Sequence, residues 1–140
     1  MRFLIIDDDR VSRARLSAVL TQYGQCDVAE TIDQGFESFC EAWTQWQPYD
    51  LVTIDISLAE ENGIDLLIKL RDAERARNVS KNKRTLIFMV TSHHYETDIH
   101  RSVFAECDEY ILKPFYSFDL KERLEKYGFS KLQQSTCEYY

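Results

Sequence analysis

Acidic, hydroxyl and basic side chains stand directly after four short apolar runs in this sequence. Asp7 and Asp8 follow the first run, Asp55 the second, Thr91 the third and Lys113 the fourth. Short apolar runs of this kind are typical of strands that are buried on both faces of a sheet. Because parallel strands bring their carboxyl ends to one edge, where ligands bind, we expect these five side chains to converge there.

Three of the five side chains are carboxylates, and bringing them together is electrostatically unfavourable. Like charges ~4 Å apart repel by several kcal/mol at an effective dielectric near 20. A divalent cation would relieve that repulsion, and hard oxygen ligands suit Mg²⁺, which takes one or two carboxylates plus water and phosphoryl oxygens. The set therefore predicts phosphoryl chemistry, in which Asp55 attacks phosphorus, Lys113 neutralises the phosphoryl oxygens and Thr91 donates a hydrogen bond to one of them.

The apolar runs alternate with segments of helical periodicity. Strands are expected at Phe3–Ile6, Cys26–Ala29, Leu51–Ile54, Leu86–Val90 and Tyr110–Leu112. The first expected helix carries an apolar stripe from Leu16 and ends near Gly24, and the second begins at Thr31 and stops before Pro48. The third opens at Asn62-Gly63, the fourth spans about Thr97 to Ala105, and the fifth runs from a Ser117 cap through Tyr127. This alternation predicts an α/β fold, a doubly wound five-stranded parallel sheet with helices on both faces.

Length and composition favour one globular domain and exclude several classes of partner. The chain has 140 residues, 44% of them hydrophobic, and a formal net charge of −7. That charge repels polyphosphate, so we expect neither nucleic acid nor an anionic membrane as a partner. The four cysteines form no CxxC pair and the first apolar run is too short for a signal peptide, so we expect a cytoplasmic protein.

One segment is unusually basic. Lys69 to Arg84 holds seven of the 17 Lys and Arg residues. We interpret it as a solvated helix face and loop rather than as a docking surface.

The strand-end motifs together resemble the receiver domain of bacterial two-component response regulators, the CheY-like family. The sequence reads FLIIDDD, LVTID, LIFMVTS and YILKPF in the family's order, and the similarity covers Arg2 to about Gly128. The resemblance implies a flavodoxin-like receiver domain over residues 1–128, followed by a short tail over 129–140.

The resemblance assigns a role to the acidic residues. Asp55 corresponds to the phospho-acceptor and Asp8 to a direct Mg²⁺ ligand, while Asp7 acts largely through water. The backbone carbonyl of Ser57 falls where the family supplies a further Mg²⁺ contact, so the implied metal set is Asp7, Asp8, Asp55 and Ser57.

The remaining motifs correspond to the family's switch. Thr91 resembles the hydroxyl that turns toward the phosphoryl group, and Tyr110 the aromatic side chain coupled to it. Lys113 resembles the phosphate counter-charge, followed by what is often a cis peptide bond, here Lys113-Pro114.

The resemblance also implies partners. Asp55 would receive its phosphoryl group from a sensor histidine kinase or a phosphotransfer protein, and the chain would promote only its own phosphorylation and dephosphorylation. Because about a dozen residues follow the last expected helix, we expect a stand-alone receiver whose output is contact with a downstream protein. The expected helix at Thr97–Ala105, the strand at Tyr110 and the helix after Ser117 would form the output surface, through which the family also allows a dimer.

The sequence departs from the family pattern just after Asp55. Where the family usually shows an apolar residue and then proline, this chain has Leu58-Ala59, and Glu60 and Glu61 add negative charge. We expect a less restrained loop and altered phosphorylation kinetics, with the same chemistry.

Two alternatives remain open from the sequence. One is a haloacid-dehalogenase-like phosphatase that uses Asp7 as its nucleophile, since Asp7-x-Asp9 follows an apolar strand, but that interpretation leaves Asp55 without a role. The other is an interaction module of the same fold that is not phosphorylated.

Overall fold

The sheet has five parallel strands in the spatial order β2-β1-β3-β6-β7. The structure, a computed structural model, describes residues 1–58, 61–92 and 106–132. The strands are β1 (Arg2–Ile6), β2 (Gln25–Ala29), β3 (Leu51–Ile54), β6 (Leu86–Thr91) and β7 (Glu109–Leu112). The strand order reverses between β1 and β3, which is the switch point where ligands bind in doubly wound sheets. The predicted five-stranded parallel sheet is confirmed.

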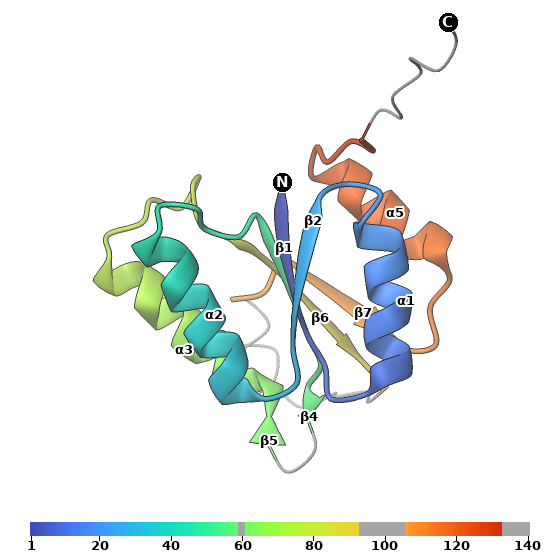
Figure 1. The fold of residues 1–140 in the computed structure, drawn as a ribbon, viewed down its shortest axis with the longest axis horizontal. Helices are drawn as coiled ribbons and strands as arrows, with labels where there is room; N and C mark the ends of the chain where they lie inside the picture. Colours follow the sequence, from blue (N-terminus) through green and yellow to red (C-terminus); the bar gives the residue numbers. More distant parts are fainter. Residues whose placement is uncertain (59–60, 93–105, 133–140) are drawn as a thin grey trace, which may run out of the picture.

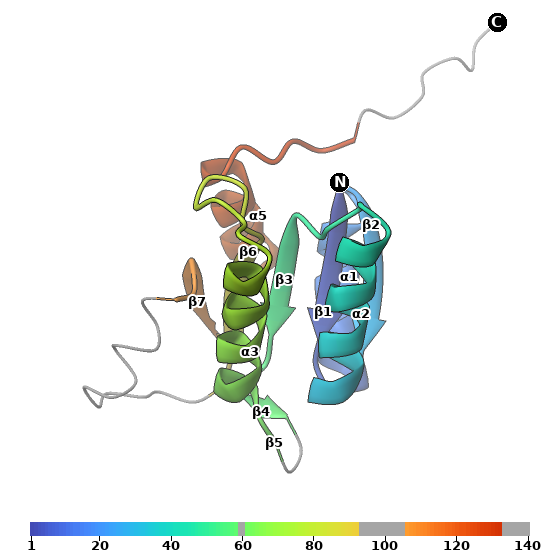
Figure 2. The ribbon, with the colours of Figure 1, turned by 90° about the vertical axis from the view of Figure 1, so that its left-hand side faces the viewer.

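Among the described residues, helices cover both faces of this sheet (Figure 1). The helices α1 (Arg10–Leu20) and α5 (Ser117–Lys126) lie on one face, and α2 (Ile32–Thr44) and α3 (Gly63–Ala76) lie on the other. Figure 2 shows α2 and α3 running alongside one another over their face. The helix expected at Thr97–Ala105 lies outside the described residues.

Alternate side chains of each strand fill two separate cores, as the pleat of a strand requires. Leu4 and Ile6 of β1 pack toward α2 and α3, whereas Phe3 and Ile5 pack toward α1 and α5. All four side chains are at most 1% exposed. Within the described part of the chain, no helix is both long enough and apolar enough to cross a membrane.

Polar caps start the helices on the side of the sheet where the strands end. The Thr31 hydroxyl accepts a hydrogen bond from the Gln34 backbone N–H (3.1 Å), and the Asn62 side chain accepts one from that of Ile64 (2.9 Å). Each cap satisfies a donor that has no partner inside its helix. The predicted starts of α2 and α3 are therefore confirmed.

Two helix boundaries differ from the sequence prediction. Ser117 is the first residue of α5 rather than its cap, because Tyr116 holds the extended cap conformation and its backbone N–H donates to the Asp119 carboxylate (3.0 Å). The helix α1 ends at Leu20 rather than near Gly24, and the Gly24 N–H then closes the following turn on the Leu20 carbonyl (3.1 Å).

The interpretation of the basic segment as a solvated surface is wrong for one residue. Arg71 lies on α3 and is only 2% exposed, and its guanidinium is bonded to acceptors on other parts of the chain. The neighbouring Lys69 and Arg75 are exposed, as predicted.

A short antiparallel ladder that sequence analysis did not predict follows β3. The strands β4 (Ser57–Leu58) and β5 (Glu61–Asn62) pair at the lower edge of the view in Figure 1 and lead directly into Gly63. Gly63 packs against the backbone of Asp55: a Cβ atom there would lie 2.2 Å from the Asp55 carbonyl oxygen. The first residue of α3 must therefore be glycine for the helix to start this close to Asp55.

Replacing this glycine should be costly. In Gly63→Ala the clash is with backbone, which cannot move without shifting Asp55, so we expect a loss of about 1–3 kcal/mol in the free energy of unfolding. Gly35→Ala is the matched control, because there the new Cβ would meet the movable end of the Ile6 side chain at 2.6 Å. Urea unfolding of both variants measures the difference, and a Gly63→Ala protein as stable as Gly35→Ala would contradict the close approach.

Candidate functional site

Asp7 and Asp55 lie next to each other at the switch point of the sheet. Each is the first residue after its strand, and the backbone ladder continues for one more step. The Asp55 N–H donates to the Ile6 carbonyl (3.0 Å), and the Asp7 N–H donates to the Ala29 carbonyl (3.1 Å). The sheet thus fixes where both carboxylates start, and both side chains are buried, with Asp7 1% and Asp55 7% exposed.

Asp8 completes a cluster of three carboxylates. Unlike Asp7 and Asp55, it is exposed. One carboxylate oxygen from each of the three residues lies within 4.8 Å of the other two. The predicted convergence of the acidic side chains is therefore present in the structure.

The Lys113 ammonium joins the two buried carboxylates. Its Nζ atom lies 2.8 Å from Asp7 Oδ2 and 3.2 Å from Asp55 Oδ2. The sequence predicted that a divalent cation relieves the carboxylate repulsion, and Lys113 already relieves part of it. Three carboxylates and one ammonium still leave excess negative charge at this edge.

Burial and neighbouring charges shift the pKa values of Asp7 and Lys113 in opposite directions. Burial raises the pKa of Asp7 above its ordinary value, although the hydrogen bond from Lys113 opposes that shift. Burial by itself would lower the pKa of Lys113, but its contacts with Asp7 and Asp55 outweigh that effect and leave the pKa raised. Lys113 is therefore held in its charged form beside Asp55.

The backbone also brings Thr91 and Tyr110 to this part of the sheet. Thr91 is the last residue of β6 and is fully buried, and its carbonyl accepts a hydrogen bond from the Lys113 N–H (2.7 Å). Tyr110 is half-buried on β7 opposite Met89 of β6. The Lys113-Pro114 peptide bond is cis, as the resemblance implied.

The donor set fits a hard divalent cation. Carboxylate oxygens are the ligands that Mg²⁺ prefers, and one exposed carboxylate beside two buried ones leaves the cluster accessible from solvent on one side. Ser57 begins β4 two residues after Asp55. The residues present therefore suit Mg²⁺ binding.

Two residues that are not among the predicted site residues hold Asp7 in place. The Asp9 backbone N–H donates to Asp7 Oδ1 (2.9 Å), and the Arg13 guanidinium donates to the Asp7 carbonyl (2.9 Å). The position of Asp9, two residues after Asp7 at the start of a helix, was a usable signal for this turn. Nothing in the sequence singled out Arg13.

Comparisons with known proteins agree with this geometry. The family model described as "Response regulator receiver domain" matches residues 3–125. A chemotaxis protein CheY homolog of Campylobacter jejuni is 30% identical over 128 residues, which cover 89% of this chain and 90% of the relative. CheY1 of Helicobacter pylori is also 30% identical, over 89% of this chain and 94% of the relative.

Solved structures show the same fold. A CheY-like receiver domain protein from Methanospirillum hungatei has a TM-score of 0.69 and 26% identity, covering 90% of this chain and 91% of that one. The response regulator TrrA from Thermotoga maritima, solved in complex with Mg²⁺ and BeF, has a TM-score of 0.68 and 26% identity, covering 89% of this chain and 96% of that one.

The charge balance of the cluster predicts opposite effects on stability and metal binding. In Asp8→Asn one of three repelling charges is removed, so the metal-free protein should gain a few tenths to about 1 kcal/mol, the range for exposed charges. The same change should remove most of the stabilisation by Mg²⁺, which for wild type is roughly 2.7 kcal/mol at a hundredfold excess over the dissociation constant.

Thermal melts in EDTA and across a Mg²⁺ titration test both effects. A mutant that is less stable than wild type without metal, or that Mg²⁺ stabilises equally, would show that Asp8 is not part of a cation site.

Proposed function

The chain belongs to the response regulator receiver family, and on that premise we propose that it is a phosphorylation-controlled switch in which Asp55 accepts the phosphoryl group. The observation that carries the proposal is the bridge from Lys113 to Asp7 and Asp55 at the switch point of the sheet. It places a fixed positive charge beside a carboxylate that ends a central strand. A phosphoryl group on Asp55 would offer its oxygens to that ammonium.

The phosphoryl group would pass from a histidine of the donor to Asp55 in one displacement at phosphorus. An Asp55 carboxylate oxygen forms a bond to phosphorus while the bond from phosphorus to the donor's histidine nitrogen breaks. The electron pair of that bond stays on the nitrogen, and the donor ring, which carries a proton on its other nitrogen, leaves as neutral imidazole. Lys113 stabilises the charge on the transferring oxygens. When bound, Mg²⁺ would supply further neutralisation of those oxygens.

The metal ligands that we propose follow from the exposure of Asp8 and from the hydrogen bonds that already occupy Asp7. Asp8, which is exposed, would bind Mg²⁺ directly with Asp55 and the Ser57 carbonyl. Asp7 would act largely through water, since its Oδ2 atom is occupied by Lys113 and its Oδ1 atom by the Asp9 N–H. The Mg²⁺ complex of the Thermotoga maritima relative supports this assignment of the cation.

The response to phosphorylation would pass through Thr91 and Tyr110. A phosphoryl group offers new acceptor oxygens that draw the Thr91 hydroxyl toward Asp55. The space this vacates would let the half-buried Tyr110 ring move inward. The chain would promote its own phosphorylation and dephosphorylation and no other turnover, and its receiver unit would span residues 1–128.

A surface beside Lys113 suits contact with a protein phosphodonor. A hollow of about 340 Å³ is lined by residues that include Val11, Arg15, Lys113 and Phe115. Val11 is 62% exposed, so a protein that approaches this hollow can contact its apolar side chain close to Lys113. We propose that a histidine kinase or phosphotransfer protein approaches there.

Family membership favours this function over the two alternatives. The phosphatase interpretation would make Asp7 the nucleophile, but Asp7 is 1% exposed and both of its oxygens accept hydrogen bonds from within the protein. A module without phosphorylation would explain the bridge between Lys113 and Asp55 only as charge compensation, and it would give the exposed Asp8 of the cluster no role.

Phosphorylation of Asp55 can be tested with a small acyl phosphate and Mg²⁺. We expect one phosphoryl adduct on the wild-type protein by intact mass, located at Asp55 by peptide mapping, and none in Asp55→Asn. Asp9→Asn is the matched control and should keep the adduct, because Asp9 is exposed and caps α1. An adduct that persists in Asp55→Asn would refute the assignment, and turnover of a phosphomonoester by that variant would favour the phosphatase.

A further inference from the structure

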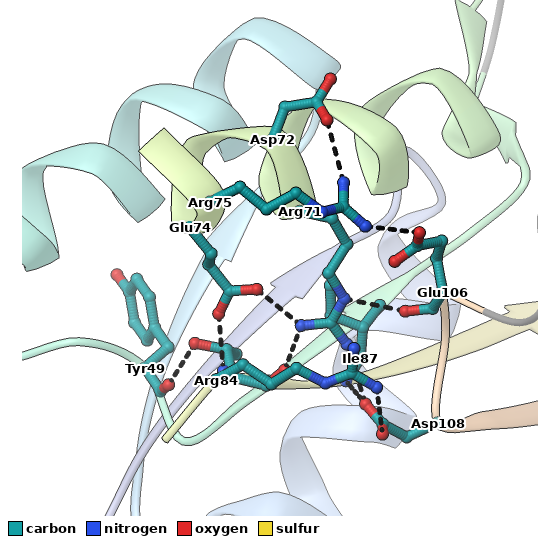
Figure 3. Close-up of polar contacts among 10 residues, drawn as sticks. Tyr49, Arg71, Asp72, Glu74, Arg75, Arg84, Ile87, Glu106 and Asp108 are labelled. Atoms are coloured by element: carbon teal, nitrogen blue, oxygen red, sulfur yellow. Dashed lines mark hydrogen bonds and ion pairs between the residues drawn. The ribbon is translucent and has the colours of Figure 1, made fainter. Parts of the chain in front are cut away.

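Arg71 is a buried arginine whose guanidinium reaches far beyond its own helix (Figure 3). Its Nε atom donates to the Glu106 carbonyl (2.8 Å), and one terminal nitrogen donates to the Thr85 carbonyl (2.7 Å). The same nitrogen contacts Glu74 Oε1 (2.7 Å), and the other contacts Asp108 Oδ2 (2.9 Å). One side chain of α3 thus holds the residues just before β6 and those just before β7.

Asp108 connects this network to the sheet. Its backbone N–H donates to the Ile87 carbonyl (2.8 Å), and its carboxylate accepts from the Ile87 N–H (2.9 Å). Its carbonyl accepts a hydrogen bond from the Tyr127 hydroxyl at the end of α5 (2.9 Å). These bonds fix Asp108 against β6, so they set the first step of the β6–β7 ladder.

The ladder in turn sets the place of Tyr110. Phe88 pairs with Glu109 and Met89 with Tyr110. A slip of one residue would turn the Tyr110 side chain to the other face of the sheet. Because Asp108 precedes Tyr110 by only two residues, the contacts of Arg71 act directly on this register.

The other end of α3 touches the proposed phospho-acceptor. Gly63 packs against the Asp55 carbonyl, and its N–H donates to the Ile56 carbonyl (2.9 Å). Between Gly63 and Arg71 the helix rises about 12 Å, at 1.5 Å per residue. Its inner side chains there, Leu66, Leu67 and Leu70, are fully buried. The same packed helix therefore contacts Asp55 at one end and the start of β7 at the other.

Stability alone does not explain a buried charge network of this kind. Removing charges from water is unfavourable, and apolar packing of the same volume often stabilises a protein as well or better. What the planar guanidinium supplies is several donors in a fixed arrangement, which defines one geometry for its acceptors.

We infer that Arg71 is a positioning residue for the switch: it fixes the start of β7 so that Tyr110 responds to Asp55 from a defined place beside Thr91. This inference rests on the proposed function, in which phosphorylation of Asp55 moves Tyr110. It assigns to α3 a role in the response that the motifs at the strand ends do not contain.

The test uses a fluorinated tyrosine placed at position 110 and read by ¹⁹F NMR with and without Mg²⁺ and beryllofluoride. Arg71→Lys keeps the charge but lacks the planar set of donors. Asp108→Asn is the second variant, because it keeps the side-chain shape and removes the negative charge that faces Arg71. Arg75→Lys is the matched control, since Arg75 lies one turn further along α3, is exposed and contacts the Glu106 carboxylate from outside.

We expect wild type and Arg75→Lys to move from one ¹⁹F resonance to another on loading. Arg71→Lys and Asp108→Asn should populate two resonances in both states, with the loading-induced change in their ratio smaller by about fivefold or more. The half-time of Asp55 phosphorylation by acetyl phosphate should stay as in wild type, because the acceptor site lies at the opposite edge of the sheet.

A lower melting temperature with a wild-type ¹⁹F response in both variants would overturn the inference and leave Arg71 a structural role only. A wild-type protein whose Tyr110 does not respond to beryllofluoride, although Asp55 is phosphorylated, would overturn the switch role of Tyr110 and the inference with it. The ¹⁹F response of the wild-type protein therefore distinguishes a failure of the inference about Arg71 from a failure of the proposed switch role of Tyr110.

Discussion

The ammonium of Lys113 lies between two buried carboxylates at the point where the order of the strands reverses. Neither carboxylate could be buried there unpaired, because a charge taken out of water is stabilised only by a partner or by hydrogen bonds. The arrangement needs three strand ends in register: β1 places Asp7, β3 places Asp55 and the turn after β7 places Lys113. The parallel sheet and its two layers of helices are the framework that meets this requirement.

The same framework connects the site to distant parts of the chain. The helix α3 begins against the carbonyl of Asp55, and the absence of a Cβ atom at Gly63 allows that contact. Eight residues further along this helix, Arg71 binds the residues that precede β7. The two ends of the parallel strands are thus connected by β6 and β7, which carry Thr91 and Tyr110. They are also connected by α3, which carries no residue of the phosphorylation motifs.

Local patterns in the sequence predicted most of the fold and the cluster. The strand at Leu51–Ile54 has the predicted bounds, because three apolar residues and a β-branched threonine directly before an acidic residue leave few alternatives. The role of Arg71 could not be predicted, since its acceptor Asp108 lies 37 residues away in the sequence. Arg71 is also one of seven basic residues in one segment, a pattern that is typical of an exposed surface. The β4–β5 ladder escaped prediction because two-residue strands show no periodicity. The cap of α5 is Tyr116 and not the predicted Ser117, because the local backbone, rather than the side-chain type, decides where that helix begins.

A crystal structure of the protein with Mg²⁺ and beryllofluoride tests most directly whether Asp55 is the phospho-acceptor beside Lys113 and the cation. We expect beryllium bonded to an Asp55 carboxylate oxygen, a Mg²⁺ ion about 2.0–2.1 Å from oxygens of Asp8 and Asp55, and Lys113 contacting a fluoride. Beryllofluoride bonded to Asp7, or a Mg²⁺ ion bound away from the three carboxylates, would contradict this assignment.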